Sequence, residues 1–532
     1  MRNNLSKRTL DLGLFLAIAL GLIASWPFLA NPGLPGATDA ELHIYRIAEL
    51  GFSLQAGNLY PRWAPDFYYG HGYPIFNYYA PLTYHLGNWL TLLQPQHAVT
   101  GAKLLFILSQ VLGTAGAYLL GKKFGRQGGG LLGAAAFTFN PYIFVINPHI
   151  RGGVAEVFAV ALIPWALWSW ESLWQDGGRA NFIIAILSAG GVLLSHNLSG
   201  LTTMILLVAL SLWRWISLSE RTNFWRALLA GVLIVGLTAY FWLPFLMERS
   251  YIKLDVAGEG HYDFRNHFVR LRELFAPLPR LDWGSTVPYV PMTFGLVQGV
   301  LFVLGTLLVL KQRLLRSLGF YVVSGATCLF LVTPFSKAVW ELVPGMTYYQ
   351  FPWRFLGPLA ALAVPPIAIL GRQAQQNKRS MVLLMLLFST VLFTALPGLA
   401  LPPWEDAFGI ITPRSIIEEE LKGQWRGTTS TNDFVPTTVD MIPGPHESVL
   451  DSYPPPVDRV NRYTLPDQAN VEVLPSAPWH NHFAVTTPEK FVLRLYLFHF
   501  PGWHAYIDGQ PAPIEIAHPE GFITVEVPAG EH

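Results

Sequence analysis

Long apolar runs recur along most of this chain, and they limit its fold more than any other feature. About eleven runs of roughly 17 to 22 residues occur, each long enough to cross a bilayer as a helix. They lie near 11–30, 101–120, 129–147, 154–174, 181–196, 200–216, 227–246, 292–310, 317–334, 353–371 and 380–399. Only 13% of the residues are charged, against about 25% in ordinary soluble domains. The sequence therefore predicts a polytopic α-helical membrane protein.

The short loops between these runs alternate in charge, which predicts their orientation. Every second loop carries Lys or Arg, namely GKKFGRQ, WQDGGRANF, SLSERTNFWR, KQRLLRS and GRQAQQNKRS. The opposite loops, such as NPHIRGG and SHNLSG, carry one basic residue or none. Because basic loops stay on the cytoplasmic side, we expect a cytoplasmic N-terminus, a retained first anchor and an extracytoplasmic C-terminal region.

All long polar segments then fall on the outer side. We expect a multi-span domain over residues 1–400, with long outer loops at 31–100 and 247–291, and an extracytoplasmic β-rich domain over 401–532. In the latter, FVLRLYLFHF, HAYIDGQPAPIEIA and GFITVEVPAG alternate like strands, with turns at Asp508-Gly509 and Pro519-Glu520-Gly521. This pattern predicts a small β-sandwich. The sequence stops at PAGEH, where we expect one more strand, so we interpret the domain as truncated after His532.

The first outer segment begins with charged residues at helical spacing. Asp39, His43 and Arg46 are separated by four and then three residues, so they share one stripe of a helix. A solvated helix could show this spacing by accident, but at the outer end of a span it favours a functional site. The segment continues with NLYPRWAPDFYYGHGYPIFNYYAPLTYH, which contains Arg62 and Asp66 among many aromatic residues. Such a stretch suits either an interfacial belt or a wall facing saccharide or lipid.

More ionisable residues lie at the outer ends of later runs. In NPHIRGGVAEVF, His149 and Arg151 precede Glu156, which lies inside an apolar run. An ionisable residue within a span is costly and is a functional candidate by default. The alternative is structural, because Glu156 lies five residues beyond Arg151 and could simply neutralise it.

Two further polar positions have the same double interpretation. His196 and Asn197 in LLSHNLSG either cap two helices or contact a substrate or metal. Arg354 in YYQFPWRFLG either extends toward the membrane surface or binds a lipid-linked phosphate.

The histidines and aspartate of GEGHYDFRNHF would hold a divalent ion only with further ligands. The single cysteine excludes an intrachain disulfide and a Cys-based zinc site, and a net charge of +1 gives no field for nucleic acid.

Several of these stretches together resemble a group of bacterial multi-pass membrane proteins. The stretches DAELHIYRI, LYPRWAPDFYYGHGYPIFNYYAPL, RGGVAE, SHN and FPWRFLG resemble the 6-pyruvoyl-tetrahydropterin synthase-related proteins and the neighbouring YfhO-type proteins. The end of the chain, from FPGWHAYIDGQPAPI to GFITVEVPAGEH, is similar to the YfhO-type outer β-domain. Both groups are similar to the GT-C glycosyltransferases, which use sugars carried on polyprenyl phosphate. The resemblance implies a GT-C-like fold of about eleven spans in the bacterial plasma (inner) membrane.

The resemblance also implies roles for particular residues. The catalytic acid of that superfamily falls on Asp39, which would take the proton of the acceptor hydroxyl. Many members have a paired acidic motif, whereas here Glu41 would point about 200° away from Asp39 on a helix. A divalent cation, Mg or Mn, is the cofactor that this resemblance admits. The substrate-binding residues would be His43, Arg46, Arg62, Asp66, His149, Arg151, Glu156, His196, Asn197 and Arg354.

Three functions remain open from the sequence. The leading hypothesis is a membrane glycosyltransferase that moves a sugar from a polyprenyl-phosphate-linked donor to a cell-envelope glycan, lipid or protein on the outer face. The alternatives are a flippase or transporter of a lipid-linked saccharide, and a non-catalytic envelope-assembly protein. Transporters often show internal repeats and charges near the bilayer midplane. Here the polar residues gather at the outer ends of the runs, which favours an enzyme.

Overall fold

The computed structural model describes residues 11–35, 39–217, 223–278, 291–372, 377–399, 404–405, 408–424, 427–429, 431–453 and 456–532. The basic N-terminal segment 1–10 lies outside these residues. Two compact units are present. Unit 1 comprises Met1–Thr38, Leu105–Leu237 and Asp263–Glu405, and unit 2 comprises Asp39–Leu104, Thr238–Tyr262 and Asp406–His532. The predicted domain division at residue 400 remains a prediction.

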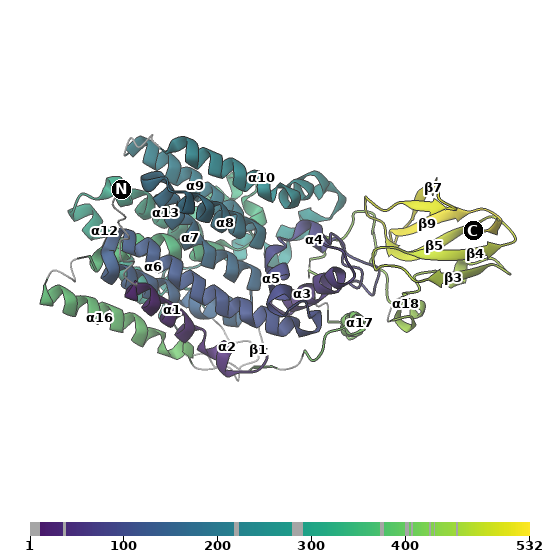
Figure 1. Ribbon diagram of the computed structural model, residues 1–532, viewed down its shortest axis with the longest axis horizontal. Helices are drawn as coiled ribbons and strands as arrows, with labels where there is room; N and C mark the ends of the chain where they lie inside the picture. Colours follow the sequence, from purple (N-terminus) through teal and green to yellow (C-terminus); the bar gives the residue numbers. More distant parts are fainter. Residues whose placement is uncertain are drawn as a thin grey trace, which may run out of the picture. The chain divides into compact units, whose positions relative to one another are not determined.

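Unit 1 is built from apolar helices (Figure 1). Seven helices among the described residues are long and apolar enough to cross a membrane, and three apolar helices are shorter. All eleven predicted runs are largely helical, while the number that cross the membrane remains a prediction. The helices that lie wholly or mainly in unit 1 are α1 (Leu12–Ala24), α2 (Trp26–Ala30), α6 (Ala98–Thr138), the π-helix η2 (Tyr142–Arg151), α7 (Val154–Asp176), α8 (Arg179–Ser195), α9 (Asn197–Ser217), α10 (Phe224–Glu248), α12 (Leu296–Lys311), α13 (Leu315–Val332), α15 (Leu356–Leu370) and α16 (Lys378–Ala395). The start of α6, up to Leu104, and the end of α10, from Thr238, belong to unit 2.

Helix α6 contains two of the predicted runs because the chain reverses within it. Arg126 has φ 57° and ψ −165°, which is not helical. A Cβ on Gly121 would lie 3.2 Å from Cα of Gly130, whereas nine residues of continuous helix span about 13.5 Å. The two halves of α6 therefore pack against each other as a helical hairpin.

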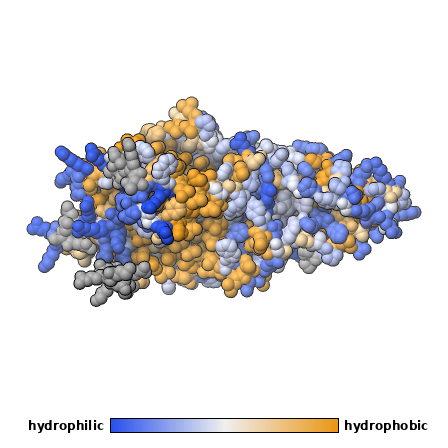
Figure 2. All heavy atoms as spheres, turned by 45° about the horizontal axis from the view of Figure 1, so that its top comes forward, coloured by the Kyte–Doolittle hydropathy of each residue, from blue (hydrophilic) through white to orange (hydrophobic). Residues whose placement is uncertain are grey.

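Burial differs sharply between the helices of unit 1. Every residue of α15 from Leu356 to Ile369 is buried. By contrast, Trp225 on α10 is 73% exposed and Phe393 on α16 is 74% exposed, and Figure 2 shows a broad hydrophobic surface over the helical part. Exposed apolar faces of this kind suit contact with lipid.

Short elements complete unit 1. Strand β1 (Leu34–Pro35) pairs antiparallel with β2 (Trp404–Glu405). Two short helices, α11 (Leu271–Leu274) and α14 (Lys337–Leu342), lie between the long ones. The 3-10 turn η9 (Pro352–Phe355) leads directly into α15 and carries Arg354.

Unit 2 joins helices to a β-rich region. Its helices are α3 (Ala40–Gln55), α4 (Ile75–Tyr78), α5 (Leu82–Leu90), α17 (Pro413–Leu421) and α18 (Glu447–Asp451). One antiparallel sheet has the order β10 (Gly530–Glu531), β4 (His482–Thr487), β3 (Asn470–Leu474). A second antiparallel sheet has the order β5 (Phe491–Phe498), β9 (Phe522–Val527), β8 (Ile514–Ala517), and β6 (Ala505–Ile507) pairs with β7 (Gln510–Ala512). The predicted β-sheet region is confirmed.

The β-rich region follows its sequence signals closely. Asp508 (φ 50°) and Gly509 (φ 77°) form the turn between β6 and β7, with the positive φ values that an Asp-Gly hairpin turn requires. Val471, Val485 and Val525 share one hydrophobic core, although they come from both three-stranded sheets. The predicted sandwich is consistent with this core and remains a prediction.

Close packing of α12 against α15 gives a testable prediction. A Cβ on Gly305 would lie 2.2 Å from the carbonyl oxygen of Pro366, so Gly305→Ala must move a helix backbone. We expect a loss of about 1–3 kcal/mol in stability, measured as a lower Tm in detergent. The matched control is Gly231→Ala on α10, where a Cβ meets nothing within 4 Å. Equal Tm values for the two variants would contradict this packing.

Candidate functional site

Glu156 is the centre of a buried polar cluster in unit 1. It lies at the start of α7, and its side chain is only 3% exposed. The hydroxyl of Tyr142 donates to its Oε1 at 2.5 Å, and Arg151 Nη1 donates to its Oε2 at 2.9 Å. Nε of Arg354 lies 3.7 Å from the same Oε2. Two guanidinium groups therefore converge on one carboxylate.

Both guanidinium groups are fixed by further contacts. Arg151 ends η2 and donates to Asn147 Oδ1 at 2.7 Å, and its guanidinium lies 4.4 Å from the ring centre of Trp353. Arg354 donates to the carbonyl oxygen of Tyr349 at 2.8 Å. The left-handed Gly152 (φ 67°) lets the chain turn between η2 and α7, which brings Arg151 back onto Glu156. The guanidinium groups of Arg151 and Arg354 are therefore held in position by the protein itself.

The cluster joins several helix ends of unit 1. Arg151 lies at the end of η2, Glu156 at the start of α7, and Arg354 just before α15. His196 lies between α8 and α9, interacts electrostatically with Glu156, and has Nδ1 2.9 Å from Ser199 Oγ. It therefore caps a helix and also belongs to the cluster. Asn197 is the first residue of α9.

His149 lies in a different environment. Its ring is 2% exposed and stacks on Phe28 of α2, with the ring centres 4.5 Å apart. Such a stack fits an apolar wall better than a charged phosphate contact. Its predicted role in substrate binding remains a prediction.

The charge of the cluster suits an anion. Arg151, Arg354 and Glu156 together carry a formal charge of +1, and they lie at the ends of apolar helices. Guanidinium groups bind phosphate with paired hydrogen bonds. A phosphate at this end could therefore be bound while an attached hydrocarbon chain stays in apolar surroundings. This geometry does not favour a role of Glu156 as a general acid or base, because both of its carboxylate oxygens accept hydrogen bonds from Tyr142 and Arg151.

The predicted helical stripe is present in unit 2. Asp39 is half-buried and forms the N-terminal cap position of α3. His43 Nδ1 lies 3.1 Å from the hydroxyl oxygen of Tyr84, and Arg46 Nη1 lies 3.4 Å from the same oxygen. Arg46 also donates through Nε to the carbonyl oxygen of Gly427 at 2.7 Å. His43 and Arg46 thus meet at one tyrosine, and the role of Asp39 remains a prediction.

Arg62 belongs to a separate contact in unit 2. It forms an ion pair with Glu248 and donates through Nε to Asn77 Oδ1 at 2.7 Å. Asn77 Nδ2 donates to the same Glu248 carboxylate at 2.9 Å. These contacts connect the loop after α3 to the end of α10. The predicted role of Arg62 in substrate binding remains a prediction.

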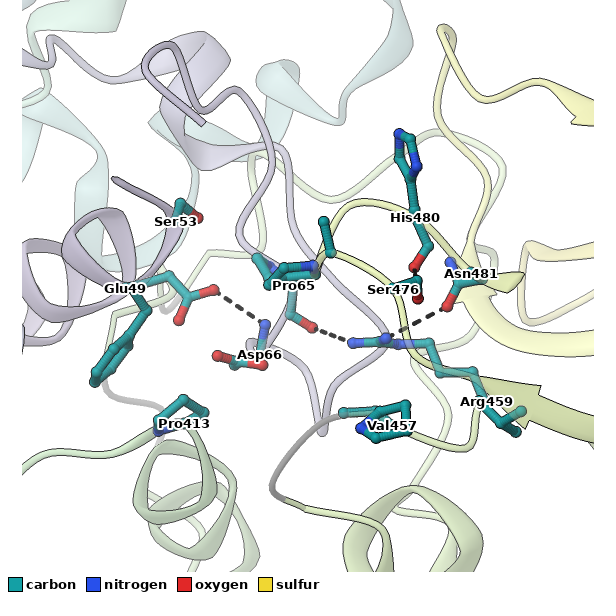
Figure 3. A pocket seen from close by; sticks show the side chains of 15 residues that line it. Glu49, Ser53, Pro65, Asp66, Pro413, Val457, Arg459, Ser476, His480 and Asn481 are labelled. Atoms are coloured by element: carbon teal, nitrogen blue, oxygen red, sulfur yellow. Dashed lines mark hydrogen bonds between the residues drawn. The ribbon is translucent and has the colours of Figure 1, made fainter. Parts of the chain in front are cut away.

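Asp66 lies beside a second buried carboxyl group. Its backbone N–H donates to Glu49 Oε1 at 3.1 Å, and the hydroxyl of Tyr453 donates to its Oδ1 at 2.6 Å. Burial raises the pKa of Glu49 well above its usual range, and the charge of Asp66 raises it further. Burial also raises the pKa of Asp66. The pair (Figure 3) therefore holds a proton to higher pH than two separate carboxyl groups would.

Several of these residues were not predicted from the sequence. Glu49 lies three residues beyond Arg46 on the buried side of α3. This helical spacing, which continues the stripe of Asp39, His43 and Arg46, could have identified Glu49 as a candidate site residue. Glu420 accepts hydrogen bonds from the backbone of Tyr68 and Tyr69, and burial raises its pKa to about 8. No local pattern marks Tyr142, because its partner Glu156 lies on another helix.

A metal centre is not evident in the part of the chain that the structure describes. No three His, Cys, Asp or Glu side chains there come close enough to hold an ion. Asp263 instead accepts a hydrogen bond from the backbone N–H of Arg265 at 2.9 Å. The His267 ring packs against Phe351, with ring centres 4.6 Å apart. The predicted divalent cation remains a prediction.

Sequence comparison connects the chain to a family of membrane proteins. Residues 76–401 match the profile of a family described as 6-pyruvoyl-tetrahydropterin synthase related domain, membrane protein. An uncharacterised protein of Lactococcus lactis subsp. cremoris (strain MG1363) is 21% identical over 261 residues, which are 48% of this chain and 42% of that protein.

Two solved structures are similar in part. ArnT from Cupriavidus metallidurans, bound to undecaprenyl phosphate, matches with a TM-score of 0.37 and 14% identity over 71% of this chain and 62% of its own. The oligosaccharyltransferase of Archaeoglobus fulgidus, in complex with zinc and sulfate, matches with a TM-score of 0.43 and 14% identity over 74% and 54%. Each of these alignments spans less than two thirds of the matched protein.

The contacts of Glu156 predict a large effect of removing its charge. Glu156→Gln keeps the side-chain volume but leaves Arg151 and Arg354 buried without their counter-ion. We expect a loss of about 3–5 kcal/mol in stability, measured as a lower Tm in nanodiscs. The control is Glu418→Gln, whose partner Arg414 lies one turn away with both side chains at least half exposed. That variant should change stability by less than about 1 kcal/mol.

The Glu49–Asp66 pair predicts a pH dependence of stability. The pKa of Glu49 is raised in the folded protein, so the folded state holds a proton that the unfolded state releases above its ordinary pKa of 4.5. Stability should therefore fall as pH rises from about 4.5 toward neutrality, by at most about 1.4 kcal/mol per pH unit for one proton. Glu49→Gln should flatten the dependence of Tm on pH. The exposed control Glu526→Gln should keep the wild-type slope, and an unchanged slope in Glu49→Gln would contradict the shared proton.

Proposed function

The chain belongs to the 6-pyruvoyl-tetrahydropterin synthase related family of membrane proteins, and we propose that it is a glycosyltransferase. It would transfer a sugar from a polyprenyl-phosphate-linked donor to a cell-envelope glycan, lipid or protein. The alternating basic loops favour a reaction on the outer face of the bacterial plasma membrane.

The observation that carries this proposal is the convergence of Arg151 and Arg354 on Glu156. A polyprenyl phosphate has an apolar tail and a charged head, so its site must offer both surroundings within a few ångströms. The end of an apolar helix bundle that holds two guanidinium groups meets this requirement. Glu156 keeps the two groups in place before the phosphate arrives, and it limits their net charge so that the phosphate can leave.

The proposed reaction is a single displacement. Asp39 takes the proton of the acceptor hydroxyl, whose oxygen forms a bond to the anomeric carbon of the donor. The bond from that carbon to the phosphate oxygen breaks, and its electron pair leaves with the phosphate. Guanidinium groups stabilise the negative charge that develops on a leaving group of this kind. Attack opposite the leaving group inverts the anomeric configuration.

A transfer assay in nanodiscs tests the proposal. Purified protein receives radiolabelled polyprenyl-phosphate hexoses and an envelope extract, with and without Mg²⁺ or Mn²⁺, and transfer of label is followed. We expect Asp39→Asn to lower transfer about 10²–10⁴-fold while donor binding is retained. Arg354→Gln should weaken donor binding. The matched control is Arg272→Gln, because the side chain of Arg272 is 75% exposed.

The outcomes separate the three functions. Transfer that is lost in Asp39→Asn and kept in Arg272→Gln supports the glycosyltransferase and identifies its base. Absence of transfer with every donor, together with movement of a labelled lipid between the leaflets, would indicate a flippase. Absence of both would leave a non-catalytic envelope-assembly protein.

A further inference from the structure

Gln350, in the segment that leads into η9, has a strained backbone. Its φ is 61° and its ψ is −47°, and the backbone N–H of Phe351 donates to the carbonyl oxygen of Tyr349 at 2.5 Å. These values define a γ-turn of the rare, strained kind, with Gln350 at its centre. Such a conformation costs free energy at a residue other than glycine, and it persists only where the surroundings fix it.

The two aromatic neighbours of Gln350 fix this turn. Tyr349 is buried, and its hydroxyl oxygen lies 2.9 Å from Oγ1 of Thr202 on α9. Phe351 is also buried, and its ring stacks on that of Trp353 with the ring centres 4.7 Å apart. The backbone of Gln350 therefore cannot relax unless one of these packed rings is displaced.

All three residues of the turn contact the guanidinium group of Arg354. Nη1 of Arg354 donates to the carbonyl oxygen of Tyr349 at 2.8 Å, and this oxygen also closes the turn. The same Nη1 donates to Oε1 of Gln350 at 3.2 Å. The guanidinium carbon of Arg354 lies 4.9 Å from the ring centre of Phe351, within the range of a cation–π contact. The turn therefore orients Arg354 through its backbone, an amide side chain and a ring.

These contacts hold Arg354 differently from Arg151. Arg151 Nη1 donates directly to Glu156 Oε2 at 2.9 Å, whereas Nε of Arg354 stays 3.7 Å from that oxygen, which is too far for a hydrogen bond. The side chain of Arg354 is also the more exposed of the two, at 15% against 9%. Carbonyl and amide oxygens are neutral, so they orient a guanidinium group without cancelling its charge. Arg354 is therefore the better placed of the two to meet an anion.

We infer that Gln350 is a positioning residue, which holds Arg354 ready for the phosphate of an anionic ligand. Only the identity of that ligand as the polyprenyl-phosphate donor rests on the proposed function. Gln350 acts through Arg354 and takes no part in the chemistry itself. Loss of its amide oxygen should therefore weaken the binding of a phosphate and leave the binding of an uncharged lipid tail unchanged.

Competition binding on the full chain in nanodiscs tests this inference. Radiolabelled polyprenyl phosphate is the probe, and uncharged polyprenol and inorganic phosphate are the competitors. Gln350→Met keeps the length of the side chain but removes the acceptor, so we expect Kd for polyprenyl phosphate to rise about tenfold, as for one charge-assisted hydrogen bond. Competition by polyprenol should not change. The matched control is Gln312→Met, because Gln312 is exposed at the end of α12.

A second background separates positioning from a general structural effect. If Gln350 acts through Arg354, Gln350→Met should have no further effect on Kd in a chain that already carries Arg354→Gln. Gln350→Gly also removes the amide but relieves the backbone strain. We therefore expect Gln350→Gly to weaken phosphate binding without lowering Tm, and it remains informative if Gln350→Met lowers Tm strongly.

The outcomes distinguish this inference from the proposed function. The inference would be overturned by an unchanged Kd in Gln350→Met and Gln350→Gly, by an equal loss in the Arg354→Gln background, or by a wild type that binds no polyprenyl phosphate. Competition by inorganic phosphate that Gln350→Met weakens would support the positioning role for the phosphate group alone. Phosphate binding that depends on Gln350, without any sugar transfer, would remove the glycosyltransferase and leave the positioning role. Sugar transfer with an unchanged Kd in both variants would overturn the positioning role and leave the proposed function intact.

Discussion

The burial of Glu156 is the constraint on which the candidate site in unit 1 depends. A carboxylate with a 3% exposed side chain inside an apolar bundle must be surrounded by donors and opposite charge. Tyr142, Arg151 and Arg354 supply them, and they come from η2 and from the turn before α15. One carboxylate therefore fixes how the ends of three helical segments meet, and it prepares the surroundings that we assign to a lipid-linked phosphate.

Unit 2 stabilises its buried carboxyl groups in a different way. Its carboxyl groups at Glu49 and Asp66 are neutralised in part by retaining a proton, because burial raises the pKa of both. The guanidinium of Arg459 is held nearby by backbone carbonyl oxygens. A proton shared between two carboxyl groups needs no counter-ion, whereas guanidinium groups surround the carboxylate of Glu156. The two guanidinium groups are the reason why we expect an anion at the cluster around Glu156.

The predictions from sequence that succeeded concern local structure. Each apolar run is helical because its backbone groups must pair within the segment when lipid surrounds it. The Asp508-Gly509 turn joins β6 to β7 because both positions tolerate positive φ. The contact of Glu156 with Arg151 could also be predicted from the sequence, since only five residues separate them. Strands β3 and β4 were missed, although they pair with each other in the sheet that also contains β10.

The helical segments, the β-rich C-terminal region and the ionisable residues at helix ends could be predicted from the sequence, because apolar periodicity and turn chemistry act over a few residues. Which of those residues meet depends on the tertiary fold. Arg354 reaches Glu156 from the turn before α15, and Asp66 contacts Glu49 and Tyr453 across 17 and 387 residues of sequence. The physical reason is that a buried charge is stabilised by whatever surrounds it in space. No periodicity along the chain records that environment.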